Sequence, residues 1–274
     1  MRDLSKILIL LYHRLLSKEE NLSKIDSEDR VYLLKEEEFS KHLEYLHSEE
    51  WSTISVEQLL ESLKNKTLFP ERSLIISFDD GNQTDYDLAF TLLERFGFKA
   101  TFFLTSDFID RPGHLTRSQI LQMSKGGMEF GSHGKTHRFL STLSEKELRS
   151  ELVESKTVLE DLIGKDISLL SLPGGYHSSE VIEMARDAGY KAIFTSRFDW
   201  NTEETDPFEL RRMSLRYSDS LSYFISLIKM DPGVYFKKRV KGSFLNLLKA
   251  VMGPNNYYRL WDLYQKSIGP QREN

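Results

Sequence analysis

The order of the predicted elements restricts the fold of this chain more than any other feature. Short apolar runs, such as residues 6–12 and 73–78, alternate with helical patterns about seven times along the sequence. Continuous apolar runs predict strands that are buried on both faces, and a repeated strand-then-helix order predicts a parallel sheet. The chain is therefore expected to be an α/β protein, with either an open doubly wound sheet or a closed barrel. No GxGxxG pattern follows the first predicted strand, which argues against a dinucleotide-binding fold.

Local signals mark the ends of the predicted helices. Ser144 is expected to open a long helix, because Glu147 occupies the capping-box position and Gly164 stands at its end. The other helices are predicted at residues 36–48, 56–63, 83–96, 116–126, 178–188 and 220–230, and the other strands at 51–54, 98–104, 128–131, 167–172, 191–195 and 210–217.

Composition excludes several classes of function. Of the 274 residues, 39% are hydrophobic and 29% charged, as in soluble globular proteins. A net charge of −5 gives no sign of nucleic-acid binding, and the absence of cysteine excludes disulfides, thiolate metal sites and cysteine nucleophiles. The first apolar run is too short for a signal peptide or a membrane span. A cytoplasmic protein is therefore expected, unless a leader has been removed.

The last part of the chain differs in composition from the rest. Residues 1–230 hold the strand and helix pattern and are expected to form one domain. Residues 231–274 carry eight Lys or Arg, three acidic residues and many aromatic ones, which predicts a basic helical extension. Such helices suit peripheral contact with a membrane, at the inner face if the protein is cytoplasmic. The favoured alternative is a pair of helices packed on the main domain with solvated lysines.

Polar residues follow two of the predicted strands where each strand ends. Asp79 and Asp80 follow residues 73–78, and His133 and His137 follow another short strand, four residues apart. In parallel α/β folds, functional sites collect at the carboxyl ends of strands. Two imidazoles and a carboxylate are a common ligand set for Zn²⁺ or a similar ion, and a second carboxylate can act as a base. The alternative is a solvated Asp-Gly turn and an exposed polar loop.

Two further strand ends carry candidate groups. Residues 172–175, Leu-Pro-Gly-Gly, follow one predicted strand, and glycine lets backbone N–H groups approach a ligand closely enough to form an oxyanion hole. A plain turn fits these residues equally well. His13 ends the first strand; a single histidine after an apolar run is more often structural, but its position at a carboxyl end favours function.

Together these residues resemble the polysaccharide deacetylases with a NodB-homology domain, carbohydrate esterase family four. Within that family the chain is most similar to the branch with an N-terminal Tyr-His motif. The similar segments are Leu-Tyr-His-Arg at 11–14, Ser-Phe-Asp-Asp-Gly at 77–81, Ser-His-Gly-Lys-Thr-His at 132–137 and, as a variant of the third family motif, Leu-Pro-Gly-Gly at 172–175. The resemblance spans about residues 5–230.

The resemblance implies a distorted (β/α)7 barrel and a role for each matched residue. The implied metal ligands, for Zn²⁺, Co²⁺ or Ni²⁺, are Asp80, His133 and His137. The implied general base is Asp79, the implied general acid is His13, and the backbone amide of Gly174 is the implied oxyanion donor.

The resemblance also implies an activity, the removal of N-acetyl groups from an N-acetylated sugar. The substrate is expected to be a polysaccharide, an oligosaccharide or a lipid-linked saccharide. A deformylase, or another hydrolase of non-peptide C–N bonds, would use the same site and is the close alternative. A carbohydrate-binding protein that has lost catalysis is the alternative of another class, and the intact set of Asp and His residues argues against it.

One position departs from the family pattern. The third motif often has an Arg two residues before its Pro, which orients the base, and this chain has Ser171 there. Arg212 is the candidate replacement. On the predicted strand 210–217, Arg212 alternates with Met213, so it points into the barrel if the apolar side faces the helices. The equally weighted alternative is an Arg in a surface ion pair.

Overall fold

The structure is a computed structural model, and it describes residues 5–20, 22, 25, 30, 32–175 and 178–240. Its main sheet comprises β1 (Lys6–Tyr12), β4 (Ser52–Thr53), β5 (Ser73–Phe78), β6 (Thr101–Leu104), β7 (Glu129–Ser132), β8 (Leu169–Ser171), β9 (Ala192–Phe194), β10 (Asn201–Thr202) and β11 (Met213–Ser214). The strand order is β10-β1-β5-β6-β7-β8-β9, with β11 also beside β1 and β4 beside β5. The pairs are parallel except β1 with β10.

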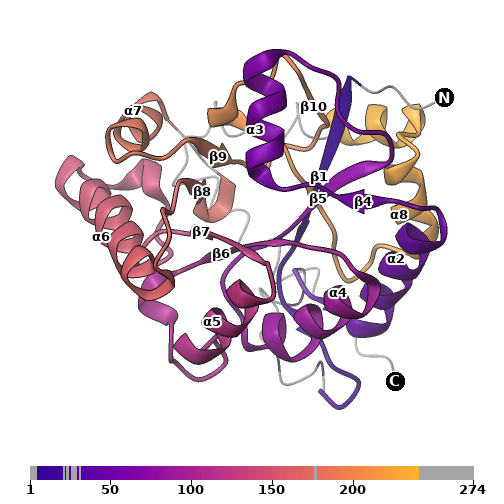
Figure 1. Cartoon of the computed structure of the whole chain (residues 1–274), viewed down its shortest axis with the longest axis horizontal. Coiled ribbons are helices and arrows are strands. Elements are labelled where there is room, and N and C mark those ends of the chain that lie inside the picture. Colours follow the sequence, from indigo (N-terminus) through magenta and orange to yellow (C-terminus); the bar gives the residue numbers. More distant parts are fainter. Residues whose placement is uncertain are drawn as a thin grey trace.

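The sheet curls until its two edges are joined by residues 210–214. Phe194 of β9 forms a single parallel bridge with Leu210, and β11 pairs with β1 a few residues later. Strands β1, β5 to β9 and β11 thus take the seven barrel positions, and Figure 1 shows the helices arranged around them. The expected α/β fold, a distorted (β/α)7 barrel, is confirmed.

The helices that surround the sheet begin and end close to the predicted residues. Ser55, Thr116 and Ser144 form capping boxes, and Gly164 ends the longest helix in the left-handed conformation. The predicted helix 83–96 begins as a π-helical segment, Asp85–Phe90, before it becomes α-helical. The α-helices are α2 (Glu36–Ser48), α3 (Val56–Asn65), α4 (Thr91–Phe96), α5 (Arg117–Lys125), α6 (Glu145–Ile163), α7 (Ser179–Asp187) and α8 (Leu221–Ile228).

The predicted strands differ from the structure in one pairing and in three short strands that were missed. The predicted strand 210–217 pairs with β1 only at Met213–Ser214, because the chain crosses from β9 to β1 within these residues. Strand β10 was not predicted, and neither were β2 (Leu15–Leu16) and β3 (Leu34–Lys35), which form a separate parallel pair; two residues are too few to show any periodicity.

Burial on both faces explains why β1 reads as a continuous apolar run. Leu8 and Leu10 belong to the core under helices α2 and α4, whereas Ile7 and Ile9 belong to a second core with Phe194. The strands are therefore held by apolar packing on both sides.

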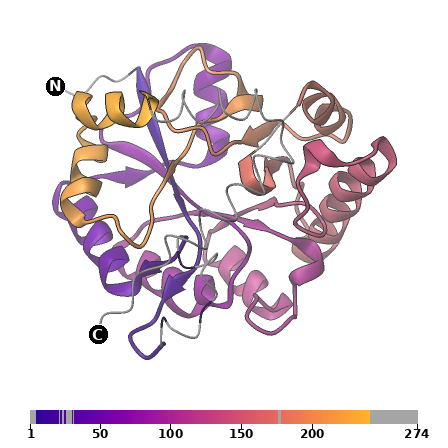
Figure 2. The same cartoon turned by 180° about the vertical axis from the view of Figure 1, so that it is seen from behind.

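The chain just beyond residue 230 packs against the main domain. Residues 232–240 are helical, and Tyr235 is buried against Phe198 and Trp200. In Figure 2 this last described helix, in yellow, lies beside the start of β1. The rest of the predicted basic extension, residues 241–274, lies outside the described residues, as does the membrane contact predicted for it. Within the described ranges, none of the helices has the length and apolar character needed to cross a membrane.

Candidate active site and metal centre

Asp79 and Asp80 lie where β5 leaves the sheet. The backbone N–H of Asp79 still donates to the carbonyl oxygen of Tyr12 at 3.1 Å, so this residue continues the pairing with β1. Asp80 has a φ of 83° and Gly81 one of 71°, and the chain turns sharply away. A left-handed backbone is unfavourable for Asp by about 1–3 kcal/mol, and such strain is typical of functional sites. The turn directs the two neighbouring carboxylates to different partners.

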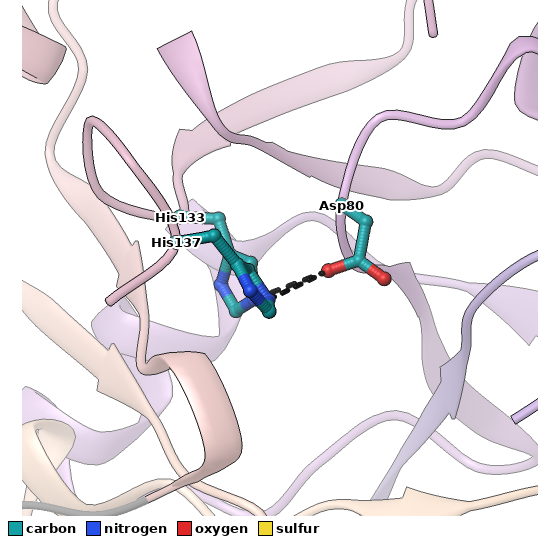
Figure 3. A group of neighbouring side chains, drawn as sticks. All are labelled: Asp80, His133 and His137. Atoms are coloured by element: carbon teal, nitrogen blue, oxygen red, sulfur yellow. Dashed lines mark ion pairs between the residues drawn. The ribbon is translucent and has the colours of Figure 1, made fainter. Parts of the chain in front are cut away.

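His133 and His137 face Asp80 from the end of β7. The ring nitrogen Nδ1 of His133 lies 2.9 Å from the carbonyl oxygen of Ser171, which leaves Nε2 free to face the site. Oδ1 of Asp80 lies 3.4 Å from Nε2 of His133 and 3.2 Å from Nε2 of His137, as Figure 3 shows. The residues predicted as metal ligands are therefore brought together, with their donor atoms all within 4.8 Å of one another.

This geometry fits a small divalent cation. A tetrahedral ion with ligand bonds of about 2.0–2.1 Å keeps its ligand atoms roughly 3.3 Å apart, close to both measured separations. Burial alone raises the pKa of Asp80, but His133 and His137 hold it well below its usual value, so the carboxylate is ionised as a ligand must be. Two imidazoles and one carboxylate leave a coordination position open, as catalytic sites require.

Glu151, which was not predicted from the sequence, holds the loop that carries both histidines. Its carboxylate is buried and accepts hydrogen bonds from the backbone N–H of Lys135 at 2.6 Å and of Thr136 at 2.9 Å. The hydroxyl of Thr136 donates to its second oxygen. One sequence signal was available: Glu151 shares the apolar face of α6 with Leu148 and Leu152, where an unpaired carboxylate would be costly.

Arg212 binds the other carboxylate, that of Asp79. The guanidinium donates through Nη1 to Oδ1 at 2.7 Å and through Nη2 to Oδ2 at 2.8 Å. Arg212 is only 1% exposed, so the alternative of a surface ion pair is excluded. Ser171, which stands where the family often has an Arg, joins the pair: its hydroxyl accepts from Arg212 at 2.8 Å and donates to Asp79 at 3.0 Å.

The electrostatics of this cluster keep Asp79 ionised. Burial alone raises the pKa of Asp79, but the charges of Arg212 and His133 outweigh burial and lower the pKa below its usual value. The carboxylate of Asp79 is therefore ionised and able to accept a proton, and Arg212 fixes its orientation.

His13 and Gly174 lie at the same edge of the barrel. Burial lowers the pKa of His13, and the charges of Asp80 and Asp79 act against this. Gly174 follows β8 by three residues, with a φ of 69° that suits glycine. Their roles as acid and oxyanion donor stay predictions.

Comparisons with known proteins agree with this geometry. The family model "Polysaccharide deacetylase" matches residues 66–193. A poly-β-1,6-N-acetyl-D-glucosamine N-deacetylase of Staphylococcus epidermidis is 26% identical over 75% of this chain and 78% of its own length. A peptidoglycan-N-acetylglucosamine deacetylase of Bacillus cereus is 30% identical over 50% of this chain and 61% of its own length.

A solved structure shows the same fold. The Streptococcus pyogenes deacetylase PplD in complex with acetate superimposes with a TM-score of 0.75 at 21% identity, covering 81% of this chain and 98% of that one. The family model and the similar sequences make this chain similar to the polysaccharide deacetylases, and the solved structure shows the same fold.

Proposed function

We propose that this protein is a metal-dependent N-deacetylase that hydrolyses the acetamido group of an N-acetylated glycan. One observation carries the proposal: the donor atoms of Asp80, His133 and His137 are spaced for one divalent ion, beside an ionised Asp79. Zn²⁺ is the proposed metal, with Co²⁺ or Ni²⁺ as substitutes. When bound, such an ion makes water more acidic and polarises a carbonyl oxygen.

In the proposed reaction, Asp79 accepts a proton from the attacking water. The reaction adds water to the amide and yields acetate and a free amine. Arg212 and Ser171 hold the carboxylate of Asp79 in one orientation, which keeps its basic oxygen ready without a reorganisation step. The proton of the water passes to Asp79 while the water oxygen attacks the amide carbon.

His13 and Gly174 complete the proposed mechanism. His13 supplies a proton to the amine nitrogen as the C–N bond breaks, because an amide anion is too basic to leave unprotonated. The backbone N–H of Gly174 donates to the oxygen that gains negative charge as the carbonyl becomes tetrahedral. The backbone can come this close because residue 174 has no side chain.

The substrate class follows the names of the relatives. The Staphylococcus epidermidis and Bacillus cereus relatives are both named for deacetylation of N-acetylglucosamine in a polymer. We therefore propose an N-acetylglucosamine-containing glycan, either a polymer or a lipid-linked saccharide.

Acetate release from defined glycans tests the proposal. Zn²⁺-loaded protein is expected to release acetate from β-1,4- or β-1,6-linked N-acetylglucosamine oligomers, and Asp79→Asn is expected to lower kcat by about 10²–10⁴. Equal release by variant and wild type would contradict the mechanism. Formate release from N-formyl sugars alone would support the deformylase alternative, and glycan binding without any release would support the binding-protein alternative.

A further inference from the structure

Two cations rest on aromatic rings at the mouth of the site. The guanidinium carbon of Arg216 lies 5.7 Å from the ring centre of Tyr32, and Nζ of Lys35 lies 5.1 Å from that of Tyr217. We call these four residues the cationic rim. Lys35 is exposed and the other three are half-buried, so solvent reaches all of them.

The cationic rim adjoins the catalytic groups. The ring centres of Tyr32 and His13 are 4.9 Å apart, so Tyr32 lies between the proposed acid and Arg216. Two backbone hydrogen bonds fix this arrangement: Leu34 donates to Arg14 at 3.1 Å, and Leu215 donates to Leu11 at 2.9 Å. Each links a rim segment to the end of β1, so the rim lies at the carboxyl edge where the site opens.

Arg216 and Lys35 differ from their cationic neighbours in their partners. Arg14 forms an ion pair with Glu20, and Lys18 forms one with Glu37. Among the described residues, no carboxylate lies within ion-pair distance of Arg216 or Lys35. The nearby Asp219 accepts the backbone N–H of Arg216 at 2.9 Å and interacts with its charge from beyond that distance. The protein carries a net charge of −5, so two cations at one opening without an ion-pair partner among the described residues are not a general property of its surface.

This arrangement suits an acidic sugar substituent. A guanidinium held on a ring face keeps its N–H edge free, and that edge matches the paired oxygens of a phosphate or carboxylate. Aromatic rings with a few placed polar groups are typical of ligand pockets. Arg216, held in place by Tyr32, can bind the charged group of a sugar that lies beside the catalytic groups.

We propose that the cationic rim binds a phosphate or carboxylate carried by the substrate, within about one sugar of the scissile amide. The inference rests on the proposed deacetylase function and narrows it: the natural substrate is an anionic N-acetylated glycan. A phosphate would indicate a glycosyl phosphate such as a lipid-linked sugar, and a carboxylate would indicate a glycan with acidic sugars.

Matched substrates test the proposal. We would compare three N-acetylglucosamine oligomers of equal length: one neutral, one with a reducing-end phosphate, and one with a carboxylate-bearing sugar next to the target residue. Wild-type protein is expected to have at least ten-fold higher kcat/KM for one anionic oligomer than for the neutral one. Arg216→Gln is expected to lower this ratio at least ten-fold. Added salt is expected to lower the ratio of the wild-type protein.

Lys18→Gln is the matched control, since it removes a paired cation from the same edge of the molecule. It is expected to leave the ratio unchanged. A wild-type ratio near one, or an Arg216→Gln ratio equal to that of wild type, would overturn the proposal. Calorimetric binding of the same oligomers to Asp79→Asn separates the two hypotheses. Suppose that Asp79→Asn binds an anionic oligomer more tightly than the neutral one, while wild type releases acetate from none of them. This result would reject the deacetylase function but support anion binding by the cationic rim.

Discussion

Arg212 and Asp79 form a buried bidentate ion pair across 133 positions of sequence, at 2.7 and 2.8 Å. The partner of the proposed base thus comes from the end of the barrel, beside β11, while Ser171 on β8 takes the position of the usual family Arg. The positive charge beside Asp79 therefore comes from the segment just before β11. Ser171 is smaller than an Arg and leaves room for the side chain of Arg212.

Replacing Arg212 by Lys tests whether orientation, beyond charge, is required. Lys keeps the charge but cannot bind both carboxylate oxygens in a fixed plane. We expect kcat to fall about 10–100-fold with little change in KM, because Asp79 acts in the transition state and not in substrate binding. Steady-state kinetics on the neutral oligomer give both constants. Arg211→Lys is the control; an equal loss in both variants would argue against a specific role.

Glu151 is expected to control metal affinity through the loop it holds. Glu151→Gln leaves one oxygen for the backbone N–H groups of Lys135 and Thr136, but it removes the charge that strengthens these hydrogen bonds and puts an NH2 group where the hydroxyl of Thr136 donates. Groups that orient metal ligands typically change affinity about 10–100-fold. Competition with a chromogenic chelator would measure the Kd for Zn²⁺. Glu154→Gln, which affects exposed hydrogen bonds from the side chains of Lys135 and Ser150, should bind Zn²⁺ like wild type.

Metal removal is expected to act on both activity and stability. An ion that binds only the folded chain stabilises it by about 2.7 kcal/mol at a hundred-fold excess over Kd. A chelator should therefore abolish acetate release and lower Tm, and Zn²⁺ should restore both. In His137→Ala the Tm response to Zn²⁺ should be lost, while His47→Ala, on exposed α2 surface, should retain it. A Zn²⁺ response that survives in His137→Ala would place the ion elsewhere.

His42 is expected to make the fold sensitive to acid. Its ring stacks on Phe224 at 3.8 Å and lies 3.2 Å from the hydroxyl of Tyr12, and burial lowers its pKa from 6.5 to about 3. The unfolded chain takes up this proton below pH 6.5, but the folded chain does not until about pH 3. The free energy of unfolding should therefore fall by about 1.4 kcal/mol per pH unit within this window.

Urea unfolding of wild type and His42→Gln from pH 7 to 4 would measure this effect. The contribution of His42 is present above its unfolded pKa and is lost as the pH falls, so the difference between the two proteins should shrink toward low pH. Burial raises the pKa of Asp85, so this residue changes the free energy of unfolding with pH in the opposite direction. Its effect is the same in both proteins and cancels when one free energy is subtracted from the other. Parallel curves for the two proteins would show that His42 does not titrate as expected.

Local sequence patterns predicted the features that depend on residues close together in the chain. The apolar run of β1, the capping box at Ser144 and the strand-end positions of Asp80 and His133 all depend on neighbouring residues. The carboxyl ends of parallel strands lie at the same edge of the sheet. The residues at those ends could therefore be assigned to one site from the order of the elements alone.

Tertiary structure alone decided which distant side chains meet. Arg212 was weighed equally between a surface ion pair and the barrel interior, since alternation on a strand says which residues share a face but not what that face contacts. Three sets of contacts depend on segments that only the closed barrel brings together. They are the hydrogen bonds from the histidine loop to Glu151, the bond from Ser171 to Asp79, and the contacts of the cationic rim. The sequence by itself determined the elements and the chemistry at their ends; packing of the barrel determined the partners that orient that chemistry, because such contacts follow from three-dimensional register and not from local propensity.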